Sequence, residues 1–210
     1  MKKILASVLL LGFAGSLFAQ DIVLPKPKTE GGIPLMEAVA KRKTDREFSS
    51  REIPLQMVSD MLWVAVGINR PESGRRTYAS ASNRQGLDVY VAMKSGFYRY
   101  DPAANILRLV VKADLRADTG SQDFVTDSPM TLVYVGDFTK WKDGITEGAV
   151  NGVNVSVGAA SHGVYLYCAS SGLNAVVRGC RGPVFEKAGL NKKTQKIMLA
   201  HTVGFPKTTN

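Results

Sequence analysis

Residues 156–171 read SVGAASHGVYLYCASS, and this run of small and apolar residues decides the fold. The pattern predicts a long helix, and Gly172 is its natural C-terminal stop. Its faces are unusually apolar and carry Val157, Ala160, Val164, Leu166, Tyr167 and Cys168. A helix that is apolar on most sides is buried in a core or at a subunit interface, so we expect this helix to be central.

The sequence on either side of this helix predicts an α+β order without an internal domain boundary. Two helices are expected at 34–43 and 54–66, because a proline opens each and Gly67 ends the second. Strands are expected at 87–93, 97–100, 106–111, 131–135, 173–177 and 197–203, and short helices at 113–119 and 185–190. Residues 69–86 are polar and predict a long loop, a kind of segment that is often functional.

The first twenty residues have the layout of a secretory signal peptide. Lys2 and Lys3 precede an apolar run from Ile4 to Phe18, and Ala19 belongs to a loose small-residue cleavage site. The run has about 15 residues, fewer than the roughly 20 that span a bilayer, which argues against a membrane anchor. We therefore expect an exported, periplasmic protein without stable membrane insertion, divided into a signal peptide (1–20), an extended arm (21–33) and one domain (34–210).

The composition favours a small anionic ligand. The 210 residues include 27 Lys and Arg against 18 Asp and Glu, a formal net charge of +9. Such a balance suggests nucleic acid, a membrane surface or a phosphorylated ligand as partner. The basic residues form short separate clusters and no nucleic-acid-binding motif accompanies them, so we expect a small phosphate-bearing molecule and no nucleic acid.

Several familiar kinds of site have no counterpart in the sequence. His162 and His201 have no Cys or carboxylate at metal-ligand spacing, so no metal site is expected. The phosphate-binding P-loop, the G-x-S-x-G nucleophile motif and the G-x-G-x-x-G dinucleotide motif are also missing. Cys168 is expected to pack as a small hydrophobe, and a disulfide between it and Cys180 stays open.

The first candidate site is Lys41-Arg42-Lys43-Thr44-Asp45-Arg46. Arg42 and Arg46 can each offer paired donors to a phosphate, and the Thr44 hydroxyl offers another. A basic helix end that complements the helix dipole explains the same residues equally well.

Two further segments suit a flat heteroaromatic ring. In Ser80-Ala81-Ser82-Asn83-Arg84-Gln85, the amides carry both donors and acceptors for a ring edge, although a plain polar loop has the same composition. In Val176-Val177-Arg178-Gly179, the glycine lets a ligand approach the backbone closely.

Together and in this order, these segments resemble the FMN-dependent nitroreductase family over about residues 34–207. Residues 41–48 resemble its R-R-S-x-R-x-F phosphate motif, with Lys43 and Thr44 in place of the usual basic residue and serine. Residues 80–85 are similar to its P-S-x-x-N-x-Q loop, but Ala79 stands where proline is expected. Three more likenesses are the central helix at 158–166, the Arg178-Gly179 pair near the flavin N5, and the terminal Gly204-Phe205-Pro206-Lys207.

The resemblance implies a three-layer α+β sandwich with a mostly antiparallel central sheet flanked by helices. It also implies an intertwined homodimer with FMN at each of two subunit interfaces. The cofactor-binding residues that it implies are Arg42, Lys43, Thr44, Arg46 and Lys207 for the phosphate, Ser80, Asn83 and Gln85 of the partner subunit for the ring, and Arg178 and Gly179 near N5. No side chain is expected to act as acid or base, because the flavin carries the chemistry.

The function that follows from the resemblance is two-electron transfer through flavin N5 to a small molecule such as a nitroaromatic or quinone. NADH or NADPH is the expected donor, yet both are scarce outside the cytoplasm, so the donor of an exported protein stays open. A flavin-dependent oxidase or dehydrogenase, like the azoline-forming branch of the family, is one alternative. A flavin-binding protein without turnover is another, because Ala79, His162 and Gly163 depart from the family pattern.

Overall fold

The computed structural model describes residues 20–207. Their elements, in chain order, are β1 (Ile22–Val23), α1 (Leu35–Lys41), α2 (Leu55–Val66), β2 (Ile68–Arg70), β3 (Arg75–Arg76), the 3-10 helix η1 (Ala81–Asn83), β4 (Leu87–Met93), β5 (Gly96–Asp101), β6 (Ile106–Val111), the 3-10 helix η2 (Ala117–Thr119), α3 (Phe124–Asp127), β7 (Met130–Asp137), α4 (Glu147–Ser171), β8 (Asn174–Arg178), α5 (Val184–Lys187) and β9 (Gln195–Gly204). Apart from Gln20, the expected signal peptide lies outside the described residues.

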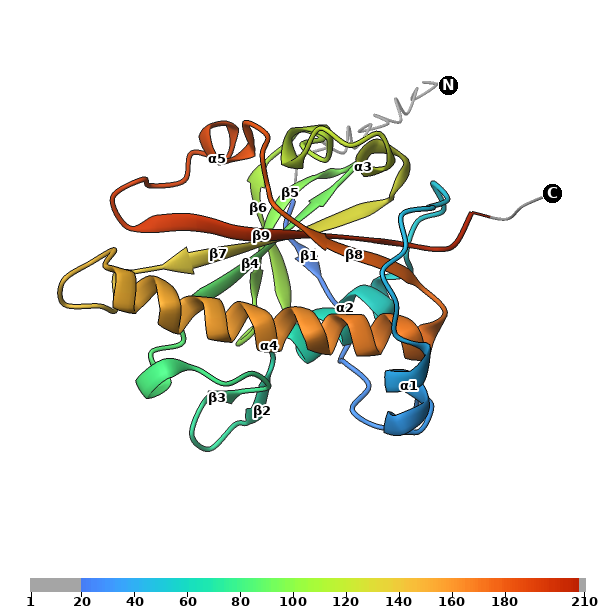
Figure 1. The fold of residues 1–210 in the computed structure, drawn as a ribbon, viewed down its shortest axis with the longest axis horizontal. Helices are drawn as coiled ribbons and strands as arrows, with labels where there is room; N and C mark the ends of the chain where they lie inside the picture. The colour runs from blue at the N-terminus through green and yellow to red at the C-terminus, as the bar shows by residue number, and fades with distance from the viewer. Residues whose placement is uncertain (1–19, 208–210) are drawn as a thin grey trace, which may run out of the picture.

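A seven-stranded sheet forms the middle layer, in the order β1-β6-β5-β4-β7-β9-β8. Every strand pairing in the described part of the chain is antiparallel. Because successive side chains of a strand point to opposite faces, Val89 and Val91 of β4 pack with α2 and α4, whereas Tyr90 and Ala92 pack toward α5. Helices thus cover both faces, as Figure 1 shows, and the expected three-layer α+β fold is confirmed.

Helix α4 crosses one face of the sheet along most of its width (Figure 1). It has 25 residues and starts at Glu147, nine residues before the predicted start at Ser156. The glycine and asparagine residues of 147–155 are weak helix formers, but the Thr146 side chain caps this end by accepting a hydrogen bond from the Ala149 N–H. Gly172, with φ of 70°, ends the helix as expected.

The two sides of α4 differ more than the sequence suggested. Its inner side is buried and includes Ala149, Val153, Val157, Ala160, Val164 and Cys168. Its outer side is exposed and built mostly from small residues, namely Gly148, Asn151, Val155, Gly158, Ala159 and His162. The helix is therefore central to the core along one side only, and the other side is an open surface of the single chain.

Three predicted segments differ from the structure. The segment 69–86 is not one loop, since it contains the hairpin of β2 and β3 followed by η1. The predicted helix at 113–119 is only the 3-10 turn η2, which ends at Gly120 as expected. The first helix, α1, ends at Lys41, two residues early, because the backbone at Arg42 is already extended.

The start of the arm of residues 21–33 joins the sheet, and the rest of it runs as irregular chain. Strand β1 pairs with β6, and Asp21 accepts hydrogen bonds from the Leu109 N–H at 2.9 Å and the Arg108 guanidinium at 2.8 Å. Further along, the Lys28 N–H donates to Asp60 at 2.7 Å. None of the helices within residues 20–207 combines the length and the apolar character needed to cross a membrane.

Candidate functional site

The basic segment predicted to bind a phosphate runs as extended chain from the end of α1 along the outer edge of β8. The Asp45 N–H donates to the Ala175 carbonyl at 3.0 Å, and the Asn174 side chain donates to the Glu47 carbonyl at 2.7 Å. Arg46 lies several residues beyond the end of α1, so a helix-dipole explanation does not account for it.

Two of the predicted phosphate ligands lie against one residue of α4. The Thr44 hydroxyl is 3.0 Å from the Tyr165 hydroxyl, and the guanidinium carbon of Arg42 is 5.5 Å from the centroid of the Tyr165 ring. Neither Arg42 nor Arg46 forms an ion pair within residues 20–207. Their donors are therefore available to an anionic ligand.

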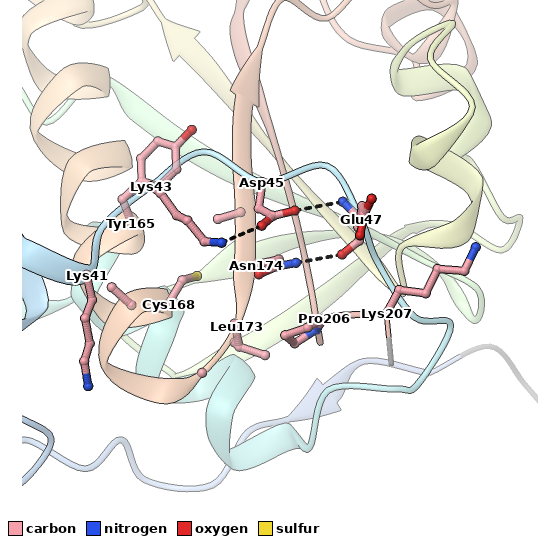
Figure 2. A pocket seen from close by; sticks show the side chains of 13 residues that line it. Lys41, Lys43, Asp45, Glu47, Tyr165, Cys168, Leu173, Asn174, Pro206 and Lys207 are labelled. Carbon is pink, nitrogen blue, oxygen red and sulfur yellow. Dashed lines mark hydrogen bonds and ion pairs between the residues drawn. The ribbon is translucent and has the colours of Figure 1, made fainter. Parts of the chain in front are cut away.

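Lys43 is engaged differently. Its ammonium group pairs with the Asp45 carboxylate at 3.0 Å, and both side chains line a cavity of about 350 Å³ together with Lys207 (Figure 2). Partial burial raises the pKa of Asp45, but hydrogen bonds from the Glu47 N–H and from Lys43 outweigh it and hold that pKa below its ordinary value. Asp45 thus neutralises Lys43, which weakens Lys43 as a phosphate ligand. Neither Arg42 nor Thr44 lines this cavity.

The residues expected near flavin N5 lie at the end of β8, where Arg178 is the last residue of the strand and Gly179 follows it. Gly179 is exposed, and a Cβ on it would meet nothing closer than the Arg181 Nε at 3.9 Å, so a flat ligand can reach this backbone. The Arg178 side chain instead points into the protein and donates to the Thr119 carbonyl at 2.6 Å and to the Thr202 hydroxyl at 3.1 Å. Burial lowers the pKa of Arg178. Its role as a flavin contact stays a prediction, and the geometry gives its guanidinium a structural role.

The Ser80–Gln85 loop is held in an uncommon backbone conformation. Ser82, Asn83 and Gln85 have φ values of 50°, 53° and 51°, which non-glycine residues adopt rarely. The Ser80 hydroxyl accepts a bond of 2.7 Å from the Gln85 N–H and so closes the loop. Strained loops of this kind persist where the surroundings fix them, and they cluster at ligand sites.

One chain does not bring this loop to the basic segment. The loop region contacts the N-terminal half of α4, where the Ser156 hydroxyl donates to the Ala79 carbonyl at 3.0 Å. The basic segment contacts Tyr165, nine residues further along. Nine residues of helix are 2.5 turns and about 13 Å, so the two contacts lie on opposite sides of α4 and well apart. Within one chain, the loop and the basic segment are therefore separate surfaces.

A buried histidine lies beneath the basic segment. The His201 ring is 4.6 Å from the Tyr165 ring between centroids, and its Nδ1 is 3.2 Å from the Tyr134 hydroxyl. Its Nε2 is buried and has no hydrogen-bond partner among the described residues. Burial lowers the pKa of His201 to about 3, so the ring is neutral at pH 7. The histidine acts as a packing residue here.

Sequence analysis missed Tyr165, which the structure places at the centre of the basic segment's contacts. It stands in the apolar run of α4, but it is neither among the apolar residues expected in the core nor among the predicted site residues. The available signal was its position three residues after His162, on a half-exposed side of the helix, but only the tertiary structure shows what lies opposite. Cys168 packs in the core as expected, and both cysteines are free thiols.

These residues fit a phosphorylated, flat ligand. Arg42, Thr44 and Arg46 offer donors at one end, and the open backbone at Gly179 lies two residues beyond Val177, whose N–H donates to the Tyr165 hydroxyl at 2.8 Å. Within residues 20–207, no group of three His, Cys, Asp or Glu side chains gathers in a way that could hold a metal ion.

Comparison with known proteins identifies the family and agrees with the fold. A family model described as the nitroreductase family matches residues 39–205. A provisionally named nitroreductase of Ralstonia eutropha JMP134 has a crystal structure that superposes with a TM-score of 0.85, at 38% identity over 91% of this chain and 92% of that one. A provisionally named nitroreductase of Methanocaldococcus jannaschii is 27% identical over 70% of this chain and 79% of its own length.

A third relative shows the same fold with a ligand. It is a provisionally named nitroreductase from Desulfovibrio desulfuricans, solved in complex with FMN. Its TM-score is 0.60 at 16% identity, and the match covers 85% of this chain and 89% of that one.

Proposed function

The chain belongs to the nitroreductase family, which makes it a flavin-type oxidoreductase, and we propose that its cofactor is FMN and its substrate a nitroaromatic, quinone or similar small acceptor. The observation that carries the proposal is the set of unpaired donors on the basic segment. Arg42 and Arg46 have no acidic partner among the described residues, and Thr44 lies beside Arg42 against Tyr165. Unpaired arginines beside a hydroxyl are what a phosphate dianion requires.

Each part of the site has its own task. Arg42, Arg46 and Thr44 hold the phosphate and so fix the position of the cofactor. The amide of Asn83 from a partner subunit contacts the edge of the ring, and the open backbone at Gly179 allows the ring to lie close to β8. FMN, when bound, supplies the two-electron transfer. The protein contributes binding and orientation, and no side chain of the site acts as acid or base.

A homodimer is part of this proposal. The loop at 80–85 and the basic segment lie on opposite sides of α4, so one chain supplies only half of each site. The exposed outer side of α4 carries mostly small residues. On α1, a helix that contacts α4, the apolar side chains of Leu35, Met36 and Val39 are 66%, 75% and 46% exposed. Burial of this surface between two chains removes the apolar area from water and completes both sites.

An anaerobic absorbance experiment tests the function. The protein, expressed and purified as a dimer, is expected to retain a flavin band that bleaches on addition of NADH or NADPH and returns on addition of a quinone or nitroaromatic acceptor. Arg42→Ala protein is the matched control and is expected to lose most of the band during purification. A protein without flavin affinity would contradict the proposal.

The same experiment separates the alternatives. A flavin band that bleaches only with an organic substrate, and not with NADH or NADPH, identifies a flavin-dependent oxidase or dehydrogenase. A band that no donor bleaches identifies a flavin-binding protein without turnover. We also propose export to the periplasm, where the donor has to be something other than a free cytoplasmic nicotinamide pool.

A further inference from the structure

Tyr165 contacts two of the three proposed phosphate-binding residues and the strand that leads to Gly179. Its hydroxyl is 3.0 Å from the Thr44 hydroxyl, and its ring faces the Arg42 guanidinium at 5.5 Å. The same hydroxyl accepts the hydrogen bond of 2.8 Å from the Val177 N–H. We propose that Tyr165 is a positioning residue of the phosphate site, which directs the Thr44 hydroxyl and places the Arg42 guanidinium; this inference rests on the proposed function.

The protons of the two hydroxyl groups determine how Tyr165 acts. A tyrosine hydroxyl has one proton to donate and lone pairs to accept. Because the Val177 N–H already donates to the Tyr165 oxygen, the Tyr165 proton can point to the Thr44 oxygen. The Thr44 proton is then free for a phosphate oxygen, which accepts only. In the reverse order Thr44 would donate to Tyr165, and the Thr44 proton would not be available to the phosphate.

The chain of donors therefore has one direction when a phosphate is bound. It runs from the Val177 N–H to Tyr165, from Tyr165 to Thr44 and from Thr44 to the ligand. Every donor in it meets an acceptor, and aligned hydrogen bonds polarise and strengthen one another. The first link is backbone of β8, so the chain is anchored in the sheet and not in a mobile side chain.

The Tyr165 ring is held firmly enough to place Arg42. One neighbour of the ring is the fully buried His201, at 4.6 Å between centroids and an interplanar angle of 50°. Since His201 is neutral, no like charge lies beneath Arg42. The ring thus offers its electron-rich face to the guanidinium, which limits the conformations of a long and otherwise unpaired side chain.

Flavin-fluorescence titrations of Tyr165→Phe test the inference. The substitution keeps the ring, its packing on His201 and the contact with Arg42, and removes only the hydroxyl. We expect FMN affinity to fall about tenfold and riboflavin affinity to change less than about twofold, because riboflavin lacks the phosphate. Tyr167→Phe is the matched control on the same helix, where the side chain is half-buried and lines a different cavity beside Trp63, and its ratio of FMN to riboflavin affinity should equal that of the parent.

A double-mutant cycle with Thr44→Val tests the route through Thr44. If Tyr165 acts through the Thr44 hydroxyl, Thr44→Val with Tyr165→Phe binds FMN no more than about twofold more weakly than Thr44→Val alone. If each substitution instead reduces FMN affinity by its own factor, and the two factors multiply in the double variant, the route through Thr44 is overturned. An equal loss of FMN and riboflavin affinity in Tyr165→Phe would show a merely structural role and overturn the inference.

The failure of the proposed function gives a different result. A parent protein that binds FMN no better than riboflavin has no phosphate site, and this appears before any substitution is made. A parent that prefers FMN, combined with Tyr165→Phe protein of unchanged preference, overturns the role of Tyr165 alone.

Discussion

The Nε of Arg76 donates a hydrogen bond of 2.9 Å to the Oε1 of Gln85. Arginine only donates, so this contact fixes which end of the Gln85 amide is oxygen. The Gln85 Nε2 then donates to the Gly74 carbonyl and to the Asn83 Oδ1, both at 3.1 Å. The Gln85 protons are therefore used within the loop and the preceding hairpin, whereas the Asn83 Nδ2 donates to no other described residue.

Arg76 is accordingly expected to support the ring contact of Asn83 from a distance. Arg76→Met removes the bond that orients Gln85 and should weaken FMN and riboflavin by the same factor, about fivefold, since both carry the ring. Fluorescence titration measures both affinities. Arg75→Met, the exposed neighbour in β3, is the control and should match the parent. Unchanged riboflavin affinity in Arg76→Met would contradict this role.

Arg42 and Lys43 are expected to differ although they are adjacent. Arg42→Ala removes an unpaired guanidinium and should weaken FMN about 30- to 150-fold, roughly 2–3 kcal/mol, with little effect on riboflavin. Lys43→Ala removes a charge that Asp45 already neutralises and should weaken FMN by less than about fivefold. Isothermal titration of the two variants provides the comparison, and equal losses would place Lys43 in the site after all.

Ala159→Arg is expected to separate the proposed dimer. Ala159 is exposed on the outer side of α4, and an arginine at an exposed helix position costs the single chain almost nothing. In a dimer that buries this side, the same arginine would be an unpaired buried charge. Light scattering should then report a monomer with weakened flavin binding, and the control Ala104→Arg, in the turn between β5 and β6, should remain dimeric. A dimer in both variants would place the interface elsewhere.

His201 is expected to make stability depend on pH. The pKa of His201 is about 3 in the folded protein and about 6.5 in the unfolded chain, so between these values only the unfolded chain binds the proton. The contribution of neutral His201 to the free energy of unfolding is complete above pH 6.5. It is lost as the pH falls toward 3, by at most about 1.4 kcal/mol per pH unit. Urea unfolding at several pH values between 4.5 and 7 should show that the free energy of unfolding of His201→Leu protein changes less with pH than that of the parent. An equal dependence on pH would show that His201 titrates normally.

Export predicts a defined mature N-terminus. Cleavage after Ala19 or Gln20 retains Asp21, whose carboxylate accepts hydrogen bonds from Arg108 and the Leu109 N–H, in the mature protein. Intact-mass measurement of protein from the periplasm of its host should find Gln20 or Asp21 first. Full-length mass in the cytoplasmic fraction would refute export.

The sequence predicted the elements whose patterning is local. Strand β4 has the predicted bounds, 87–93, since its apolar run lies between a polar loop and a turn. The start of α4 was misplaced, because a cap and a buried side outweigh the weak helix formers of 147–155. The basic segment was predicted from the hydrogen-bond donors that its side chains offer to a phosphate. Neither the neutralisation of Lys43 by Asp45 nor the contacts of Tyr165 could be found, since they depend on which way side chains point on an extended segment and on a helix 120 residues away.

Both edges of the central sheet are completed by the first fifth of the described chain. Strand β1 pairs with β6, more than 80 residues later, and the Asp45 N–H bonds to β8, about 130 residues later. Ribosomes release these early residues first, whereas β8, the partner of the Asp45 segment, is made near the end of the chain. The segment around Asp45 can therefore pair with β8 only after β8 has been synthesised. Because the proposed phosphate ligands lie on that segment, we expect the half-site to assemble only near the end of synthesis, after β8 has been made.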